Sequence, residues 1–303
     1  MARPVDAYES LKTVSALEGT KRIELPAQRV EGYKLTLEGT NASGETLKTS
    51  DLGGVRIRRP GQEKILNVRF EDLFDFQRTF RRQNPEAASA AGGAIRLVTY
   101  IENRLPGVTA SVNGYDEQRG GSLELDFDSV PGGTSGLNQI CDSLTCTVRS
   151  LVNPAYAEVQ TVRMDSLPVI RGGAGRSEVE GIDEQNVAMI FVRDTDGVVT
   201  AASLYRQTPA GEEIVFDETP VKDIEEHFVL ETDKTIDPNW TPMNVAAAPS
   251  LIQARNEGVA LYLTTSGASS AIRVVYAYIT SGVNGTLSTV QKREAMLQRL
   301  PAK

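Results

Sequence analysis

Three acidic residues alternate with apolar ones in one short segment: Glu124, Asp126 and Asp128 flank Leu125 and Phe127. Successive side chains of a β-strand point to opposite faces, so a strand here would present all three carboxylates on one face. Two carboxyl groups on either side of a sugar linkage are the usual machinery of glycoside hydrolysis. The segment is therefore the first candidate for a catalytic site.

This pattern resembles the Glu-x-Asp-x-Glu strand of laminarinase-like glycoside hydrolases, which are β-jelly rolls and use the outer two acids as nucleophile and proton donor. The third acid here is the shorter Asp128. A retaining hydrolase needs its two carboxyl groups about 5–5.5 Å apart, whereas residues four apart on a strand are about 13 Å apart at the backbone. Sugar clefts also stack on aromatic rings, and the chain has a single Trp. We interpret the acids as a solvated strand face. A jelly-roll glycoside hydrolase, or a glycan- or receptor-binding spike module without catalysis, remains the alternative.

Other reactive side chains are few. His227 is the only histidine, so a Ser-His-Asp triad or a histidine metal site would have to use it. It lies in a predicted short helix at the position that matches Phe76 in an earlier segment, which favours a packing role. Cys141 and Cys146 are too few for a structural zinc site, and we interpret them as small buried thiols. The sequence predicts no catalytic residue, no metal site and no cofactor.

A basic segment ends the sequence. It contains Lys292, Arg293, Arg299 and Lys303 against the single acid Glu294, with leucine and valine at helical spacing. The pattern predicts a C-terminal helix. Its charges are either solvated on a helix docked on its own domain, or they contact an anionic surface such as an inner membrane or a genome.

Composition sets the broad class. The 303 residues are 40% hydrophobic and 24% charged, which is typical of a globular protein with room for about two domains. A net charge of −8 repels phosphate backbones, which excludes nucleic-acid binding by the surface as a whole. No apolar run approaches the roughly 20 residues of a membrane-spanning helix. The N-terminus lacks the apolar core of a secretory signal, so we expect the protein to stay in the cell that makes it or to leave by lysis.

Short strands dominate the predicted secondary structure. The segments with the clearest alternation of apolar and polar side chains are 21–25, 33–37, 55–58 and 123–128. Further strands are expected at 95–101, 187–193, 259–263 and 272–279. Many short strands separated by turn residues are typical of a sandwich or jelly roll.

Helical patterns are sparse. Leu73, Phe76 and Phe80 have helical spacing within 71–82, and Pro220 begins a second candidate at 220–228, where proline suits the first turn. Two more helices are expected at the termini. The N-terminal one is based on apolar residues at every third position: Val5, Tyr8, Leu11, Val14 and Leu17.

Four blocks recur in the same order at offsets between 149 and 155 residues. The first matches Leu35 and Leu37 to Ile190 and Val192. The second matches Gly61-Gln62-Glu63 and Ile65 to Gly211-Glu212-Glu213 and Val215, and the third matches Asp72-Leu73 to Asp223-Ile224. The fourth matches Leu123, Leu125 and Phe127 to Ile272, Val274 and Tyr276. We therefore expect two copies of one domain, with Leu35, Leu37, Leu125 and Phe127 in one core and Ile190, Val192, Val274 and Tyr276 in the other.

The second copy has a longer excursion at 231–257, with the only Trp, Trp240, and three prolines; it is a candidate inter-subunit or outer-surface feature.

Through these paired blocks the chain resembles the double jelly-roll major capsid proteins of tailless icosahedral viruses, including bacteriophages with an internal membrane, over about residues 20–280. The resemblance implies an all-β fold of two tandem antiparallel jelly-roll domains, with short helices after a mid-domain strand and at the termini. It also implies a homotrimer that forms a pseudo-hexagonal tile of an icosahedral shell, with both termini inward. The implied partners are copies of the chain itself, other virion proteins, and an inner membrane or genome touching Lys292, Arg293, Arg299 and Lys303. The implied location is the virion, after synthesis in the host cytoplasm.

The predicted domain organisation follows the repeat. It comprises an N-terminal helical arm (1–19), a first jelly roll (20–152), a second jelly roll (153–285) and a C-terminal basic helix (286–303).

Overall fold

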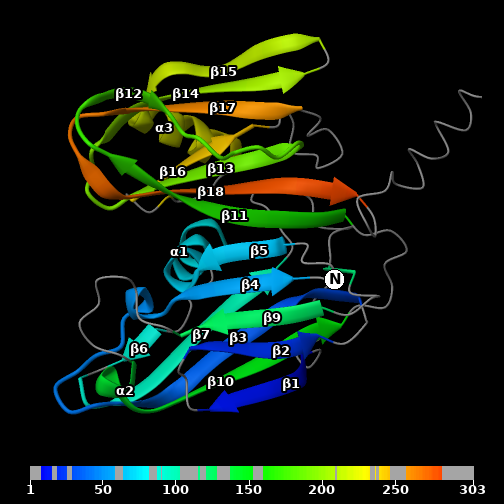
Figure 1. Cartoon of the computed structure of the whole chain (residues 1–303), viewed down its shortest axis with the longest axis vertical. Helices are drawn as coiled ribbons and strands as arrows, with labels where there is room; N and C mark the ends of the chain where they lie inside the picture. Colours follow the sequence, from blue (N-terminus) through cyan, green and yellow to red (C-terminus); the bar gives the residue numbers. More distant parts are fainter. Residues whose placement is uncertain are drawn as a thin grey trace, which may run out of the picture.

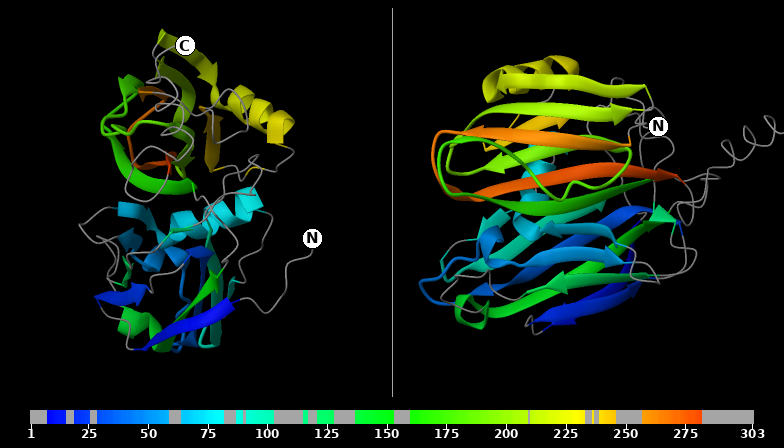
Figure 2. Two further views of the ribbon diagram at one scale, coloured as in Figure 1. Left: turned by 90° about the vertical axis from the view of Figure 1, so that its right-hand side faces the viewer. Right: turned by 45° about the horizontal axis from the view of Figure 1, so that its top comes forward.

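Two β-sandwiches lie one above the other in Figure 1, and the strands of both run in about the same direction (Figure 2). The structure is a computed structural model. It describes residues 8–15, 19–25, 29–58, 64–81, 87–89, 91–102, 115–116, 121–127, 137–152, 160–208, 210–232, 236, 239–245 and 257–281. All eight predicted strand segments lie in strands, except that the segment at 123–128 is in strand only as far as Asp126.

The first sandwich consists of two sheets. One has the strand order β1-β10-β3-β7-β6. Its members are β1 (Tyr8–Ser15), β10 (Cys141–Val152), β3 (Arg29–Asn41), β7 (Ala94–Glu102) and β6 (Ala87–Ser89), and β8 (Tyr115–Asp116) pairs with β3. The facing sheet has the order β2-β9-β4-β5. Its members are β2 (Thr20–Leu25), β9 (Gly121–Asp126), β4 (Gly54–Arg58) and β5 (Lys64–Arg69).

The second sandwich repeats this arrangement. One sheet has the order β11-β18-β13-β16 and the other β12-β17-β14-β15. The members of the first are β11 (Gln160–Arg171), β18 (Ser269–Ser281), β13 (Val187–Asp194) and β16 (Trp240–Asn244). Those of the second are β12 (Gly175–Glu178), β17 (Gly258–Thr265), β14 (Val199–Thr208) and β15 (Gly211–Pro220). In each half four strands of one sheet face four of the other, β1-β10-β3-β7 against β2-β9-β4-β5 and β11-β18-β13-β16 against β12-β17-β14-β15, which is the arrangement of a jelly roll. Both halves of the chain are therefore jelly rolls.

A parallel strand pair joins the halves. Strand β5 of the first jelly roll pairs with β11 of the second, at Leu66 with Met164 and at Asn67 with Asp165. Among the described residues this creates one eight-stranded sheet, β16-β13-β18-β11-β5-β4-β9-β2. A sheet of each jelly roll is thus continuous with a sheet of the other.

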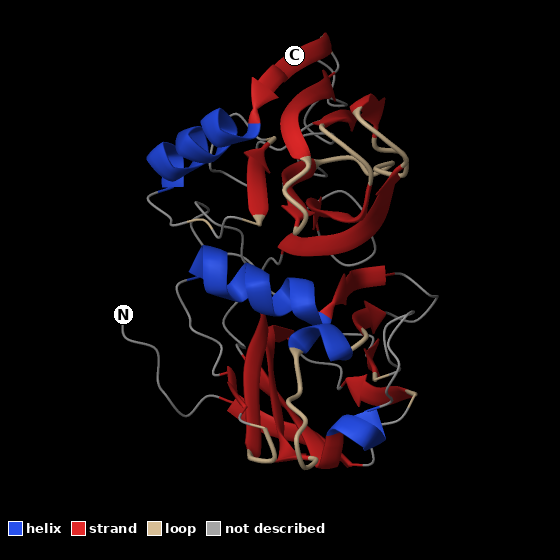
Figure 3. Ribbon diagram, turned by 90° about the vertical axis from the view of Figure 1, so that its left-hand side faces the viewer, coloured by secondary structure: helices blue, strands red, loops and turns tan. Residues whose placement is uncertain are grey.

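The two internal helices are confirmed. Helix α1 (Phe70–Arg81) follows β5, and α3 (Val221–Thr232) follows β15 directly after Pro220. Two shorter helices in the first half are η1 (Thr49–Asp51) and α2 (Leu137–Ile140). Figure 3 shows α1 between the two jelly rolls and α3 on the outer side of the second one.

The predicted N-terminal helix is wrong for residues 8–15. These residues form β1, which pairs antiparallel with β10, for example at Thr13 with Thr147. An apolar residue at every third position makes no single helical face, and the edge of the sheet offers backbone hydrogen-bond partners that override weak helical propensity. This segment therefore belongs to the first jelly roll and is no separate arm. The predicted C-terminal helix at 286–303 lies outside the described residues.

Part of the expected excursion at 231–257 is also a strand. Residues 240–244 form β16, at the edge of its sheet beside β13, and Trp240 is fully buried. Pro242 within the segment argues against a central strand, but proline is tolerated at sheet edges. Strand β16 is therefore largely core rather than a surface feature.

Two clusters of buried apolar side chains fill the molecule. Leu35, Leu37, Leu125 and Phe127 belong to the first, as predicted. Ile190, Val192, Val274 and Tyr276 belong to the second, also as predicted. The first cluster extends beyond its own jelly roll to include residues of the second: Met164, Ala188, Met189, Phe191, Phe228, Trp240, Val275 and Ala277.

Three of the four repeated blocks fall on equivalent elements. They lie on β3 and β13, on β5 and β15, and on α1 and α3, which occupy the same places in the two halves; Gly61, Gln62 and Glu63 lie outside the described residues, so Ile65 alone places the second block on β5. The fourth match is wrong, because β9 is equivalent to β17 and β18 is equivalent to β10. The connection after β9 spans residues 127–140, whereas that after β17 spans only 266–268. A constant offset therefore cannot continue through the last two strands.

Candidate functional site at the contact between the two jelly rolls

One sheet of the second jelly roll is buried on both faces. Along β13, Ile190 and Val192 point into the core of their own sandwich. Met189 and Phe191, on the opposite face, join the cluster of the first sandwich. Strands covered on both sides are apolar at nearly every position, which explains the run from Val187 to Val192. The outer face of this sheet is therefore the contact surface between the halves.

Aromatic rings form the apolar part of the contact. Phe76 of α1 meets Phe191 edge-on, with ring centroids 5.2 Å apart and planes at 81°. Phe191 in turn meets Trp240 at 6.3 Å and 75°. Edge-to-face geometry is preferred between aromatic rings because the positive ring edge faces the negative ring face. The contact is thus packed in the same way as a protein core.

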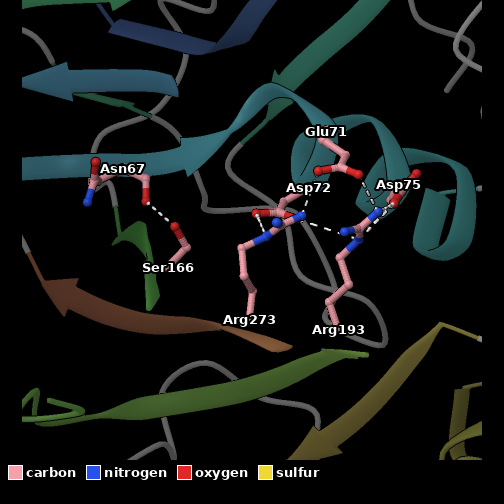
Figure 4. A network of polar contacts seen from close by, with 7 residues as sticks. All are labelled: Asn67, Glu71, Asp72, Asp75, Ser166, Arg193 and Arg273. Atoms are coloured by element: carbon pink, nitrogen blue, oxygen red, sulfur yellow. Dashed lines mark hydrogen bonds and ion pairs between the residues drawn. The ribbon is translucent and has the colours of Figure 1, made fainter. Parts of the chain in front are cut away.

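An ionic network joins α1 to β13 and β18 at the same contact (Figure 4). Arg193 Nη2 donates to Glu71 Oε1 at 2.7 Å, and its Nε donates to Asp75 Oδ2 at 3.1 Å. Arg273 Nη2 donates to both Glu71 Oε2 and Asp72 Oδ1 at 2.7 Å. Two arginines on neighbouring strands of the second jelly roll therefore hold three carboxylates on one helix of the first.

Burial makes this network sensitive to the loss of any member. The Asp72 side chain is 1% exposed and that of Arg193 is 7% exposed. Burial raises the pKa of Asp72, and the charge of Arg273 opposes that rise. Burial would also raise the pKa of Glu71, but the two arginines outweigh it and hold the pKa below its ordinary value. Burying a charge is costly unless it is paired and hydrogen-bonded, so the pairs are needed to keep the halves in contact.

Polar side chains also link the two strands at the junction. Asn67 Nδ2 donates to Asp165 Oδ1 at 2.6 Å, and Ser166 Oγ donates to the Asn67 carbonyl oxygen at 3.2 Å. Arg56 Nε donates to Asn67 Oδ1 at 3.3 Å. The first two bonds join β5 to β11 and hold their register, and the third holds Asn67 against β4.

Three solved structures are similar in fold to this chain over nearly its whole length. The major capsid protein P2 from bacteriophage PM2 is 15% identical; the match covers 91% of this chain and 98% of that one, with a TM-score of 0.59. The STIV MCP is 12% identical, with 97% and 99% covered and a TM-score of 0.63. A chain in the structure of Sulfolobus Turreted Icosahedral Virus is 10% identical, with 97% and 93% covered and a TM-score of 0.67.

The fold is that of the double jelly-roll major capsid proteins. No protein-family model matches the chain, and no curated protein sequence does either. The likeness therefore lies in the fold rather than in the sequence.

Within this double jelly roll, two acids of the predicted catalytic strand pair with arginines. Glu124 Oε2 lies 3.1 Å from Arg58 Nε, and Asp126 Oδ2 lies 3.6 Å from an Arg56 guanidinium nitrogen. Both arginines are on β4, the neighbouring strand, in register with β9. The two carboxylates thus form cross-strand ion pairs, which are ordinary stabilising contacts of a sheet face. Asp128 lies outside the described residues.

The other predicted candidates are scattered over the double jelly roll. His227 is exposed on α3 and meets Phe216 edge-on, with centroids 6.2 Å apart, so its ring packs at the surface. Cys141 and Cys146 are free, buried thiols on β10, as interpreted. Burial raises the pKa of Cys141 to about 11 and that of Cys146 to about 12, which leaves both thiols protonated at neutral pH. The basic residues Lys292, Arg293, Arg299 and Lys303 lie outside the described residues.

In the part of the chain that the structure describes, no group of three or more His, Cys, Asp and Glu side chains could hold a metal ion. None of the described helices has the length and hydropathy required to span a membrane.

Sequence reasoning missed Arg193 and Arg273. A usable pattern exists, because each arginine interrupts or ends an otherwise apolar strand, at 187–193 and at 272–279. An arginine within a strand that is apolar on both faces must be buried, and a buried arginine needs an acidic partner. The partners on α1 could not be found from spacing, because they lie 118 to 202 residues away along the chain.

Proposed function

We propose that the chain is the major capsid protein of an icosahedral virus, and that it assembles as a homotrimer whose six jelly rolls form a pseudo-hexagonal capsomer. The observation that carries the proposal is the double jelly-roll fold, which matches the major capsid protein P2 from bacteriophage PM2 over more than 90% of both chains. A fold alone does not fix a function. Here the match extends to the pairing of two jelly rolls in one chain, which is the feature a capsomer of this kind needs.

The rigid contact between the jelly rolls supports this proposal. The β5–β11 junction and the Glu71–Arg193 and Asp72–Arg273 pairs hold the two halves at one relative orientation. Repeated copies of a unit with fixed geometry build closed symmetric assemblies. Three chains, each with two similar jelly rolls at a fixed angle, would form a ring of six similar jelly rolls. Such a ring has a nearly hexagonal outline and can pack in a hexagonal lattice.

The proposed role is non-enzymatic. The acidic strand, the strongest catalytic candidate in the sequence, has Glu124 and Asp126 paired with arginines of β4. These pairs give the two acids a stabilising role that explains their presence. The alternatives of a glycoside hydrolase and of a glycan- or receptor-binding module gain no support from them.

The proposed location is the virion, after synthesis in the host cytoplasm. The partners would be copies of the chain, other virion proteins and, through Lys292, Arg293, Arg299 and Lys303, an inner membrane or the genome. The proposed domains are a first jelly roll ending near residue 152 and a second one at 153–285.

The oligomeric state tests the proposal directly. Multi-angle light scattering of the purified chain should give a mass three times that of the 32.8 kDa monomer. Negative-stain images should show hexagonal tiles. A monomer at concentrations that support assembly would overturn the proposal.

A further inference from the structure

The two equivalent helices have opposite surroundings. The face of α1 that carries Glu71, Asp72 and Asp75 is covered by the second jelly roll through the ionic network. Helix α3, in contrast, lies on the outer side of the second jelly roll (Figure 3), and no described element covers the matching face. Its residues, which we call the α3 outer face, are all exposed: Lys222, Asp223, Glu226, Val229 and Leu230. Three of them, Lys222, Asp223 and Glu226, correspond at an offset of 151 to the three acids of α1.

The two equivalent sheets also have opposite surroundings. The outer face of β13 and β18 is covered by α1, with Phe191 at 0% and Val275 at 1% exposure. The equivalent outer face of the first jelly roll has a polar part on β3, β10 and β7 that is exposed or half-buried, beside Val98 of β7, which is 4% exposed. The residues of this polar part, which we call the β3 outer face, are Lys34, Thr36, Glu38, Arg96, Thr145 and Arg149. Each chain therefore has one helix-on-sheet contact made, and at the equivalent positions it has an exposed helix face and a partly exposed polar sheet face.

The charges of the uncovered surfaces are complementary. Three bases and one acid give the β3 outer face a local charge of +2, and one base and two acids give the α3 outer face −1. This basic face is notable in a chain whose net charge is −8. Complementary charge favours encounter between such surfaces and sets their register.

The match extends to one residue pair. The repeat that aligns Ile190 with Leu35 places Glu38 of β3 at the position of Arg193 in β13. On the helices, Lys222 stands at the position of Glu71. The intrachain pair Glu71–Arg193 is thus matched by Lys222 and Glu38, with both signs reversed. A contact that repeats the intrachain geometry would again bring opposite charges together.

We propose that α3 of one copy docks on the β3 outer face of a neighbouring copy, as α1 docks on β13 and β18 within the chain. The partner is a second copy of this chain, and Lys222 pairs with Glu38 across the contact. This inference rests on the proposed capsomer and specifies its interface. A head-to-tail contact between two different surfaces closes into a ring when a whole number of its rotations completes a full turn. In such a ring the α1 contact within a chain would alternate with the α3 contact between chains.

The α3 outer face also has two exposed apolar residues, which a docked neighbour would remove from water. Leu230 is 85% exposed and Val229 is 40% exposed. Single exposed apolar residues are common on protein surfaces, so Leu230 supports the proposal only together with the charge match and the helix equivalence. In the docked state its side chain would leave water against the β3 outer face.

A charge-reversal cycle tests the proposal. The variants are Lys222→Glu, Glu38→Lys and the double variant, with Glu180→Lys, an exposed acid outside both surfaces, as the control. Glu38 makes only a 3.6 Å surface pair with Arg96, with both side chains more than half exposed, so all variants should fold.

Each single reversal should raise the trimer dissociation constant by at least about tenfold, because like charges meet at the contact. The double variant should return to within about threefold of the wild-type value, and the control should not change it.

The outcomes separate the two proposals. A stable wild-type trimer whose dissociation is unaffected by either reversal, or a double variant that is weaker than both singles, overturns the docking and leaves the capsomer standing. A wild-type chain that remains monomeric overturns the capsomer and the docking together. Zero-length coupling of amines to carboxylates, in trimers mixed from isotope-labelled and unlabelled chains, gives a second readout. It should yield a cross-linked peptide that joins Lys222 of one copy to Glu38 of another.

Discussion

Arg273 and Asp72 are 201 residues apart in the sequence, yet Arg273 Nη2 donates a 2.7 Å hydrogen bond to Asp72 Oδ1 across the contact between the two jelly rolls. The Arg273 Nε also lies 3.0 Å from both Asp72 oxygens. A planar guanidinium fork fits a carboxylate in a way that a lysine cannot reproduce. This pair therefore fixes the relative orientation of the two jelly rolls as well as their proximity.

Replacing Arg273 by methionine should destabilise the protein strongly. The change leaves the buried Asp72 carboxylate without its main partner, and breaking one side of a buried ion pair typically costs about 3–5 kcal/mol. Urea denaturation followed by circular dichroism measures the loss. The matched control is Arg22→Met, which removes an exposed pair with Glu24 and should cost about 0–1 kcal/mol. Equal losses for the two variants would contradict a central role for the network.

The same network predicts a pH dependence. The pKa of Glu71 is held below its ordinary value of 4.5, so its contribution to stability is complete above pH 4.5 and is lost as the pH falls below that value. Glu71→Gln should therefore lower the melting temperature at neutral pH. The difference from wild type should shrink steadily as the pH falls from 4.5. A difference that stays constant in acid would show that the charge of Glu71 is not what matters.

The sequence predicts the strands and their buried faces well because local alternation of apolar and polar residues encodes both. Leu35 and Leu37 alternate with polar residues, and both point into the core as expected. The same reasoning fails at Tyr8–Ser15, which form an edge strand because their backbone pairs with β10. It also fails at Trp240–Asn244, because Pro242 argues against a strand although proline is tolerated at a sheet edge. Local patterns predict which residues are buried, but they do not predict which element covers them.

The contact between the jelly rolls shows the same limit. Phe191 and Ile190 are adjacent and equally apolar, yet they belong to different clusters. Their segment predicts burial of both faces, and only the fold identifies α1 as the element on one side. The acidic strand illustrates the reverse case. The spacing of Glu124 and Asp126 suggests chemistry, while the arginines that pair with them lie on β4, far earlier in the chain.

Replacing Glu124 or Asp126 by the matching amide should leave assembly intact. Each change weakens one partly exposed ion pair with Arg58 or Arg56, which should cost no more than about 1 kcal/mol. Light scattering checks the trimer, and incubation with a β-glucan checks for hydrolysis. Turnover by the wild type that disappears in Glu124→Gln would establish a glycoside hydrolase instead.

Replacing Leu230 by aspartate should weaken the trimer without unfolding the chain. The side chain is 85% exposed, so the monomer loses little, whereas the proposed interface would have to bury an additional charge. Analytical ultracentrifugation over a dilution series should show dissociation at a concentration about tenfold higher. Ile170→Asp is the control, because Ile170 is 76% exposed on β11 and belongs to neither proposed surface. A weaker trimer in both variants would point to a general effect of added charge.

Removing residues 287–303 should spare the trimer and weaken its attachment to the virion interior. The segment carries Lys292, Arg293, Arg299 and Lys303 against Glu294, a local excess of positive charge in an acidic chain. Basic segments bind anionic lipid or nucleic acid through screened electrostatic attraction, which falls steeply with salt. The full-length trimer should therefore sediment with anionic vesicles or bind the genome at low salt and release both at high salt, and the truncated trimer should bind neither.

A variant with Lys292, Arg293, Arg299 and Lys303 changed to glutamine separates charge from length and should behave like the truncation. Binding that survives both changes would exclude the basic segment as the inner contact, and a protease that reaches residues 287–303 in intact particles would place the segment outside the shell.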